Sequence, residues 1–287
     1  MKQKVKGRRH FKKIKASYIV ATVIILLYAL TMLAPLYFVV VNSIKKPIEF
    51  YKNPWSIPTT IYLKNYIDAF KIGAGDTSLP QMYINSIILT LSATLISTIA
   101  TTAIAYALAR FKFPGRNLLV AIGIGAMLIP DLGSRTVVYK MYNDLHIIDT
   151  WFILIQYTTP FGLMFLMVFS LFQTVAKEYS EAAKIDGASE LRILVKIMLP
   201  MAWGVIGLMM VMNSIGVWND FYTPYMYLPS IKTLALGIQE LSEEAQAVSN
   251  FTVLYAAMIM SITPVLILFI CMRNTIISNV AIGGIKG

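Results

Sequence analysis

The chain has 287 residues, of which 57% are hydrophobic, and it carries a formal net charge of +11. Its mean hydropathy of +0.67 exceeds that of soluble domains, which are about half apolar. This composition excludes an ordinary soluble domain and predicts a membrane protein. The basic excess does not indicate a nucleic-acid partner, because no basic face interleaved with aromatic residues accompanies it. The single Cys271 excludes an intrachain disulfide, and His10 and His146 are too isolated to indicate a metal site.

Charge-free stretches long enough to cross a bilayer recur along the chain. A hydrocarbon core about 30 Å thick needs about 20 helical residues. Five stretches meet this length, namely Ala16–Ile44, Thr77–Ala109, Thr150–Ala176, Ile197–Asn219 and Ala245–Met272. A sixth begins at Asn117, is free of charge as far as Pro130, and continues through Asp131 and Arg135 toward Tyr142. The predicted fold class is therefore an all-α membrane protein with six transmembrane helices.

The distribution of basic residues predicts the orientation. Eight lie within the first fifteen residues: Lys2, Lys4, Lys6, Arg8, Arg9, Lys12, Lys13 and Lys15. By the positive-inside rule they anchor the N-terminus in the cytoplasm beside anionic membrane lipid. Six spans then place both termini of a multi-pass membrane protein in the cytoplasm. The loop from Arg110 to Arg116 and the segment 177–200 face the same side.

The segment from Lys45 to Gln81 is expected to be a connecting loop outside the membrane. Its four prolines, Pro47, Pro54, Pro58 and Pro80, oppose a long helix. The fragment Gly73–Asp76 resembles part of the intramembrane aspartyl protease signature, but a single aspartate in a glycine-rich loop predicts a turn. Further along, Asp131 and Arg135 are four residues apart and are expected to form a structural ion pair at the interface.

A charged segment between two long apolar stretches predicts a docking element. The chain from Lys177 to Asp186 favours a helix that stops at Gly187, because glycine accepts the left-handed geometry of a helix end. Ser189 can cap a second helix, whose apolar residues recur at helical spacing: Leu191, Leu194, Val195 and Met198. The prediction is a helix, a sharp turn and another helix. Glu181 offers a carboxylate to a basic partner group.

This segment resembles the EAA loop of ABC-importer permeases, and most closely that of the carbohydrate, maltose-permease-like group. Glu181, Ala182, Ala183, Gly187, Ile197, Leu199 and Pro200 carry the resemblance. It continues through Ile57–Phe70, Asn85 and Ser86, Ala105–Arg116, Pro130, Trp218–Tyr222 and Gly283–Gly287, so it covers nearly the whole chain after Ala34. The sequence departs from the family pattern near its end, where Asn274 and Asn279 stand in place of the family's usual arginine and glycine.

The resemblance implies a protein of the bacterial cytoplasmic (inner) membrane with a type I ABC importer permease fold in three parts. Residues 1–80 comprise the basic N-terminus, the first transmembrane helix and the outer loop; residues 81–273 form the transmembrane core with its coupling loop at 177–200; and residues 274–287 form a cytoplasmic tail. Contact with the ATPases is implied for Glu181, Ala182, Ala183, Asp186, Gly187, Leu199 and Pro200. The tail residues Gly283, Gly284, Lys286 and Gly287 are implied to reach between the ATPases.

The same resemblance implies a set of partners. They are a second, related permease, two ABC ATPase subunits, an extracytoplasmic solute-binding protein and a carbohydrate substrate. No GxxxxGK[ST], HExxH or GxSxG motif occurs in the sequence, so the chain is not expected to be an enzyme. It is expected to hold no cofactor, because ATP and Mg would be bound by the partner ATPases.

A polar and aromatic group at the far end of the fifth span is a candidate for the substrate path. It comprises Asn213, Trp218, Asn219 and Asp220, which could stack on a sugar and form hydrogen bonds with it, or could equally anchor the helix at the interface. An ion-coupled secondary transporter is the alternative function, but it would need intramembrane ionic relays and often internal repeats. An intramembrane enzyme would need a catalytic pair. The sequence shows neither the ionic relays and repeats of such a transporter nor the catalytic pair of such an enzyme.

Overall fold

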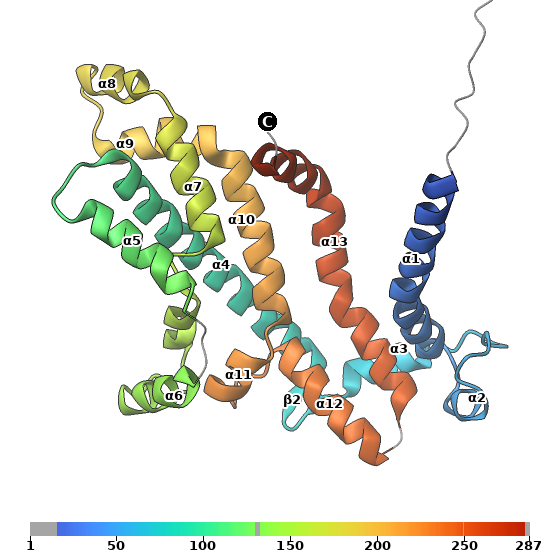
Figure 1. The fold of residues 1–287 in the computed structure, drawn as a ribbon. Coiled ribbons are helices and arrows are strands. Elements are labelled where there is room, and N and C mark those ends of the chain that lie inside the picture. The colour runs from blue at the N-terminus through green and yellow to red at the C-terminus, as the bar shows by residue number, and fades with distance from the viewer. Residues whose placement is uncertain (1–15, 130–132, 249, 285–287) are drawn as a thin grey trace, which may run out of the picture.

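The structure is a computed structural model that describes residues 16–129, 133–248 and 250–284, and the described chain is helical apart from one short hairpin (Figure 1). The first half comprises α1 Ala16–Ser43, α2 Pro47–Lys52, α3 Lys64–Lys71, β1 Gly73–Ala74, β2 Thr77–Ser78, α4 Leu79–Arg110, α5 Arg116–Met127 and α6 Ser134–Asp144. The second half comprises the 3₁₀ helix η1 Trp151–Tyr157, α7 Leu163–Thr174, α8 Lys177–Ile185, α9 Glu190–Ile193, the π-helix η2 Leu194–Met198, α10 Leu199–Asn219, α11 Tyr222–Tyr227, α12 Leu234–Val248 and α13 Phe251–Gly284.

Four helices in the described part of the chain are long and apolar enough to cross a membrane. They are Tyr18–Ser43, Leu79–Arg110, Glu190–Asn219 and Phe251–Arg273. These four helices overlap four of the five charge-free stretches of the sequence, namely Ala16–Ile44, Thr77–Ala109, Ile197–Asn219 and Ala245–Met272. Shorter apolar helices, Arg116–Met127 and Leu163–Thr174, occupy the other two predicted spans. The all-helical membrane class is therefore confirmed.

The predicted third and fourth spans differ in detail from continuous helices. The third is divided into α5 and α6, and the 12 residues of α5 rise only about 18 Å. The fourth begins as η1, is non-helical at residues 158–162, and resumes as α7. Pro160 explains this second break, because proline lacks the backbone N–H that a helix needs and disfavours helical geometry at the residue before it.

The C-terminal part of the chain also differs from the predicted arrangement of a span followed by a separate tail. The last span begins at Phe251, after the separate helix α12, and α13 continues as far as Gly284. Most of the predicted tail, from residue 274 onward, is therefore a helical continuation of the last span. Lys286 and Gly287 lie outside the described residues.

The centre of the bundle is α4, which packs against α7 and α10. From Thr90 to Ala105 its buried face is formed by alanine, serine and threonine residues, whose small side chains allow neighbouring helices to approach closely. Large side chains from the other helices fill the remaining space. Phe165 and Phe172 of α7 and Met209 of α10 are fully buried in one cluster, and Tyr106 of α4 meets Phe172 edge to face at 5.8 Å between ring centroids.

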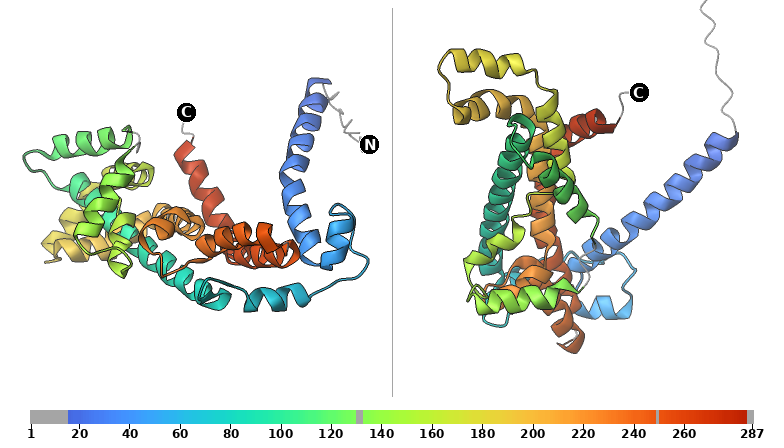
Figure 2. Two further views of the ribbon diagram at one scale, coloured as in Figure 1. Left: turned by 90° about the horizontal axis from the view of Figure 1, so that it is seen from below. Right: turned by 60° about the vertical axis from the view of Figure 1, so that its left-hand side comes forward.

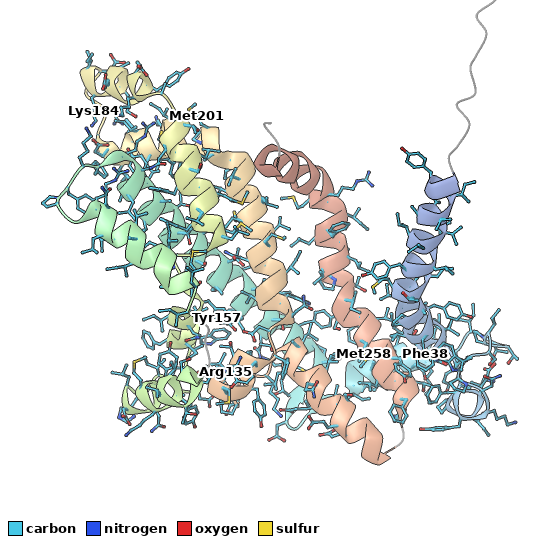
Figure 3. All side chains as sticks on the ribbon, in the orientation of Figure 1. Phe38, Arg135, Tyr157, Lys184, Met201 and Met258 are labelled. Carbon is cyan, nitrogen blue, oxygen red and sulfur yellow. The ribbon has the colours of Figure 1, made fainter. Side chains whose placement is uncertain are left out.

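Helix α1 stands apart from this bundle over most of its length (Figures 1 and 2). Its side chains from Tyr18 to Tyr37 are exposed on every face although they are mainly apolar. Packing begins only at Phe38, whose ring lies 5.7 Å from that of Tyr255 in α13 and 4.9 Å from that of Trp55. Figure 3 labels Phe38 at this meeting point.

A buried polar cluster fixes the packed end of α1. The Asn65 side chain in α3 donates to the backbone carbonyl of Lys45 at 2.7 Å and accepts from the Thr252 hydroxyl of α13 at 3.4 Å. Lys45 is itself fully buried, and its Nζ donates to the carbonyls of Asn53 and Pro54 at 3.1 and 2.8 Å. The cluster therefore joins three segments that lie far apart in the sequence.

The molecule has two distinct ends (Figures 1 and 2). The start of α1, the end of α13 and the α8–α9 pair lie at one end. The β-hairpin, α6, α11 and α12 lie at the other. The hairpin pairs Gly73 with Ser78 and Ala74 with Thr77, and Gly75 and Asp76 form the turn between the strands, so Asp76 lies in a turn as predicted.

Candidate functional site

The predicted helix–turn–helix is present, and its turn has a definite geometry. Helix α8 ends in a pair of backbone hydrogen bonds, from Gly187 N to Lys184 O at 3.0 Å and from Ala188 N to Ala183 O at 2.9 Å. Gly187 has a φ of +78°. This is the Schellman arrangement, which places a left-handed residue after the helix end. Because a Cβ at Gly187 would meet no neighbouring atom, the requirement for glycine is purely conformational.

The second helix is capped and tied to the bundle. Ser189 accepts a hydrogen bond from the backbone N–H of Arg192 at 3.4 Å, as the sequence predicts for a cap. Glu190 accepts from the Lys184 ammonium at 2.5 Å and from the Tyr106 hydroxyl of α4 at 3.1 Å. Figure 3 shows Lys184 at this end of the molecule. These contacts join α8 to α9 across the turn and join α9 to the central helix α4.

A π-helical turn connects this element to the membrane span. Leu199 donates its N–H to the carbonyl of Leu194, five residues earlier, and Pro200 follows in the first turn of α10. Pro200 has no N–H to donate and its ring would crowd the carbonyl four residues before it, so a widened turn accommodates it. Ile193 and Met198 are fully buried in the α4–α7–α10 cluster. Movement of α9 is therefore linked to α10 by continuous helix and by packing.

The predicted coupling residues form an accessible surface. Glu181, Ala182, Asp186 and Gly187 are exposed, and Ala183 is half-buried against the bundle. At the start of α10, Leu199 is half-buried and Pro200 is exposed. Sequence analysis missed Ile185, an apolar side chain that is 87% exposed beside the turn. Its position at the end of a helix outside the apolar stretches could have indicated a docking contact.

A polar cavity lies deeper in the bundle, bordered by α4, α10 and the non-helical residues 158–162. It consists of two adjoining hollows of about 290 and 180 Å³, which share Ser97, Thr159 and Asn213 as lining residues. The Asn213 amide donates to the Ser97 hydroxyl at 3.4 Å. Tyr157, labelled in Figure 3, and Asp220 both line the larger of the two hollows, and the Tyr157 hydroxyl donates to the Asp220 carboxylate at 3.0 Å.

The four residues predicted for the substrate path divide between two places. Asn213 and Asp220 line the cavity. Trp218 instead donates its indole N–H to the Ser261 carbonyl of α13 at 3.1 Å, and the Asn219 amide donates to the Ile215 carbonyl of its own helix at 2.8 Å.

Sequence analysis missed the cavity residues outside α10. They come from the hydroxyl-rich face of α4 and from the segment around Pro160, namely Ser97, Thr101, Gln156 and Thr159. The sequence signals that could have found them are the recurring hydroxyl residues of the second span and the proline within the fourth.

Some predicted contacts fall partly outside the described residues. Asp131 lies outside the described residues, and its predicted ion pair with Arg135 therefore does too. The Arg135 guanidinium lies 4.0 Å above the centre of the Tyr222 ring. The basic residues of the first fifteen positions are also outside the described part. Of the tail residues, Gly283 and Gly284 form the last turn of α13.

Comparison with known proteins defines the class of this helical membrane protein. The family model described as "Binding-protein-dependent transport system inner membrane component" matches residues 10–278. Among similar proteins are the arabinooligosaccharides transport system permease protein AraQ of Bacillus subtilis, 26% identical over 97% of this chain and 99% of the relative, and the melibiose/raffinose/stachyose import permease protein MelC of the same species, 27% identical over 93% and 96%.

A solved structure shares the fold. It is a bacterial ABC transporter involved in the import of the acidic polysaccharide alginate, and the match has a TM-score of 0.76 at 22% identity, covering 89% of this chain and 95% of the other. Because the family model spans nearly the whole sequence, the chain belongs to the inner-membrane components of binding-protein-dependent transport systems. It is thus the permease subunit of an ABC importer, a non-catalytic part of the transporter.

Proposed function

We propose that this chain is one of two related permeases that form the translocation path for a sugar or oligosaccharide. The observation that carries the proposal is the exposed α8–turn–α9 element at the end of the bundle, with its rigid connection to α10. The permeases AraQ and MelC, whose names specify oligosaccharide substrates, match almost the full length of the chain and support the carbohydrate class.

In this proposal, the α8–α9 element sits in a groove of a cytoplasmic ATPase. Glu181 and Asp186 present carboxylates, and Ile185 offers an apolar contact between them. Two ATPases bind ATP and Mg and close on each other, which moves each docked element as a rigid body. The movement reaches the span through the continuous helix α9–η2–α10 and through the contact between Glu190 and Tyr106.

Six membrane crossings with both termini in the cytoplasm agree with this arrangement. The short helices α5 and α7 would each complete a crossing with the help of neighbouring non-helical or 3₁₀ residues. Support comes from the position of the α8–α9 element at the same end as the start of α1 and the end of α13 (Figure 1). The opposite end, with the hairpin and α12, would then face the solute-binding protein.

The division of the chain into an N-terminal part to residue 80, a core at 81–273 and a tail fits the same scheme. The exposed apolar surface of α1 supports contact with a second permease or with lipid. The end of α13, with Gly283 and Gly284, would extend toward the ATPases, continued by Lys286 and Gly287.

The coupling role can be tested with two substitutions in the assembled transporter. Glu181→Lys reverses the charge offered to the ATPase, and Gly187→Pro cannot adopt the positive φ of the turn. Each is expected to reduce ATP hydrolysis stimulated by the binding protein about tenfold or more. Glu181→Asp, which keeps the charge, and Gly187→Asn, which tolerates a left-handed turn, are the matched controls. Normal stimulated hydrolysis in both test variants at normal membrane levels would disprove the docking role.

A further inference from the structure

The non-helical segment 158–162 brings backbone groups to the polar cavity. The first intrahelical bond of α7 runs from Leu166 N to Gly162 O, so the N–H groups of Leu163, Met164 and Phe165 lie in the first turn, where a helix supplies no acceptor. All three residues line the smaller hollow. Irregular backbone within a membrane bundle is stable where it is buried in protein or borders a water-filled space. The first turn of α7 therefore borders the hollow with backbone N–H groups for which its own helix supplies no acceptor.

The lining of this space mixes apolar side chains with polar ones, and every polar side chain except Asp220 is neutral. Ser97 and Thr101 line it from α4 and are only 8% and 4% exposed, and Asn213 faces them from α10. On the other side, Gln156 accepts a hydrogen bond from the Tyr142 hydroxyl at 2.6 Å through its oxygen, which leaves its amide nitrogen as the donor. These hydroxyl and amide groups can both donate and accept, as recognition of sugar hydroxyls requires.

The charge of the lining favours neutral ligands. Asp220 is the one charged side chain among the described lining residues of the two hollows, and its oxygens accept from the Tyr157 hydroxyl and from the backbone N–H of Thr223, each at 3.0 Å. Within the described part of the chain, no lysine or arginine lines either hollow. An anionic ligand would lose hydration here without gaining a cationic partner and would be repelled by Asp220.

From these features we propose that the cavity between α4, residues 158–162 and α10 is a binding subsite for an uncharged saccharide unit and rejects uronic acids. The inference rests on the proposed transport function and adds the charge class of the substrate. The fold alone does not determine this class, since the solved transporter with the same fold is described as importing an acidic polysaccharide.

Protection of a cysteine placed in the cavity tests the subsite directly. In the complete transporter carrying Cys271→Ser, Thr159→Cys should react with a small thiol reagent, because Thr159 is exposed in the hollow. Raffinose or arabinotriose should slow this reaction, whereas trigalacturonate should not. A cysteine at Thr136, on the exposed surface of α6, should react at the same rate with every sugar.

A pair of asparagine substitutions in α10 provides the matched comparison. Asn213→Leu removes an amide from the cavity, so the concentration of sugar giving half protection should rise about tenfold, equivalent to one lost hydrogen bond. Asn219→Leu makes the same chemical change six residues later, where the amide bonds its own helix, and should leave this concentration unchanged.

The outcomes separate the subsite from the transport function. Protection by trigalacturonate, or an equal effect of the two asparagine variants, would overturn the subsite. If the transporter imports a labelled neutral sugar that gives no protection, the subsite is wrong and the transport function stands. If it imports neither class of sugar, the carbohydrate function itself fails, and the subsite with it.

Discussion

Lys45 is the residue whose environment departs furthest from what its type prefers. Lysine is almost never fully buried unless it is paired, and here its ammonium is satisfied by two backbone carbonyls rather than by a carboxylate. Burial lowers the pKa of Lys45 from its usual value of 10.5, and the nearby carboxylate of Glu49 opposes this shift. The Lys45 side chain therefore holds the loop at Asn53 and Pro54 in place, although burying its ammonium costs hydration free energy.

Lys45→Met is expected to lower the free energy of unfolding by about 1–3 kcal/mol, because two carbonyls lose their donor. The wild-type pKa is lower in the folded state than in the unfolded state, so wild-type stability should rise with pH between that lowered value and 10.5. The variant should lack this rise. Thermal unfolding of the purified transporter measures both effects, with Lys46→Met at the exposed neighbouring position as the control. Equal stability of the two variants at neutral pH would contradict the proposed role.

At the scale of helices, the close contact of α5 with the segment before α7 depends on Gly123. A Cβ at this position would overlap the ring of Phe161, whereas one at Gly125 in the same helix would meet no neighbouring atom. Gly123→Val should therefore separate the two elements and reduce stability by about 1–3 kcal/mol. Gly125→Val is the matched control. A melting temperature for Gly123→Val equal to that of the control would show that the contact is not required.

The parts of the fold that were predicted from sequence are those set by local chemistry. Gly187 and Ser189 determine the coupling turn within a few residues, so its geometry could be read directly. The break at residues 158–162 was not predicted, because the length of the apolar stretch was given more weight than the presence of Pro160 within it. Single residues of the cavity carry sequence signals, but their meeting in one cavity could not be predicted, since α4, η1 and α10 come together only on packing. The separation of Asn213 from Trp218 could have been predicted from the sequence, because residues five positions apart in an α-helix point about 140° apart around its axis.

For the molecule as a whole, the arrangement of the ends predicts which surfaces face each side of the membrane. In a Cys271→Ser background, a membrane-impermeant thiol reagent applied to intact cells should label cysteines placed at Asp76 or Glu243. Both positions are exposed at the hairpin and α12 end. A cysteine at Lys184 should react only after the membrane is opened. Labelling of the Lys184 position in intact cells would reverse the orientation and remove the docking surface from the ATPases.

The polar cluster at the packed end of α1 also sets an order of assembly. Its hydrogen bond between Asn65 and Thr252 joins residues separated by 187 positions. At ribosomal speeds of about 5–20 residues per second, some 10–40 s pass between the synthesis of these two residues. Before Thr252 is synthesised, α1 cannot be held in place by its contact with α13. Contacts between residues so far apart in the sequence also form slowly. The first helix of the chain is therefore expected to be among the last to reach its native position.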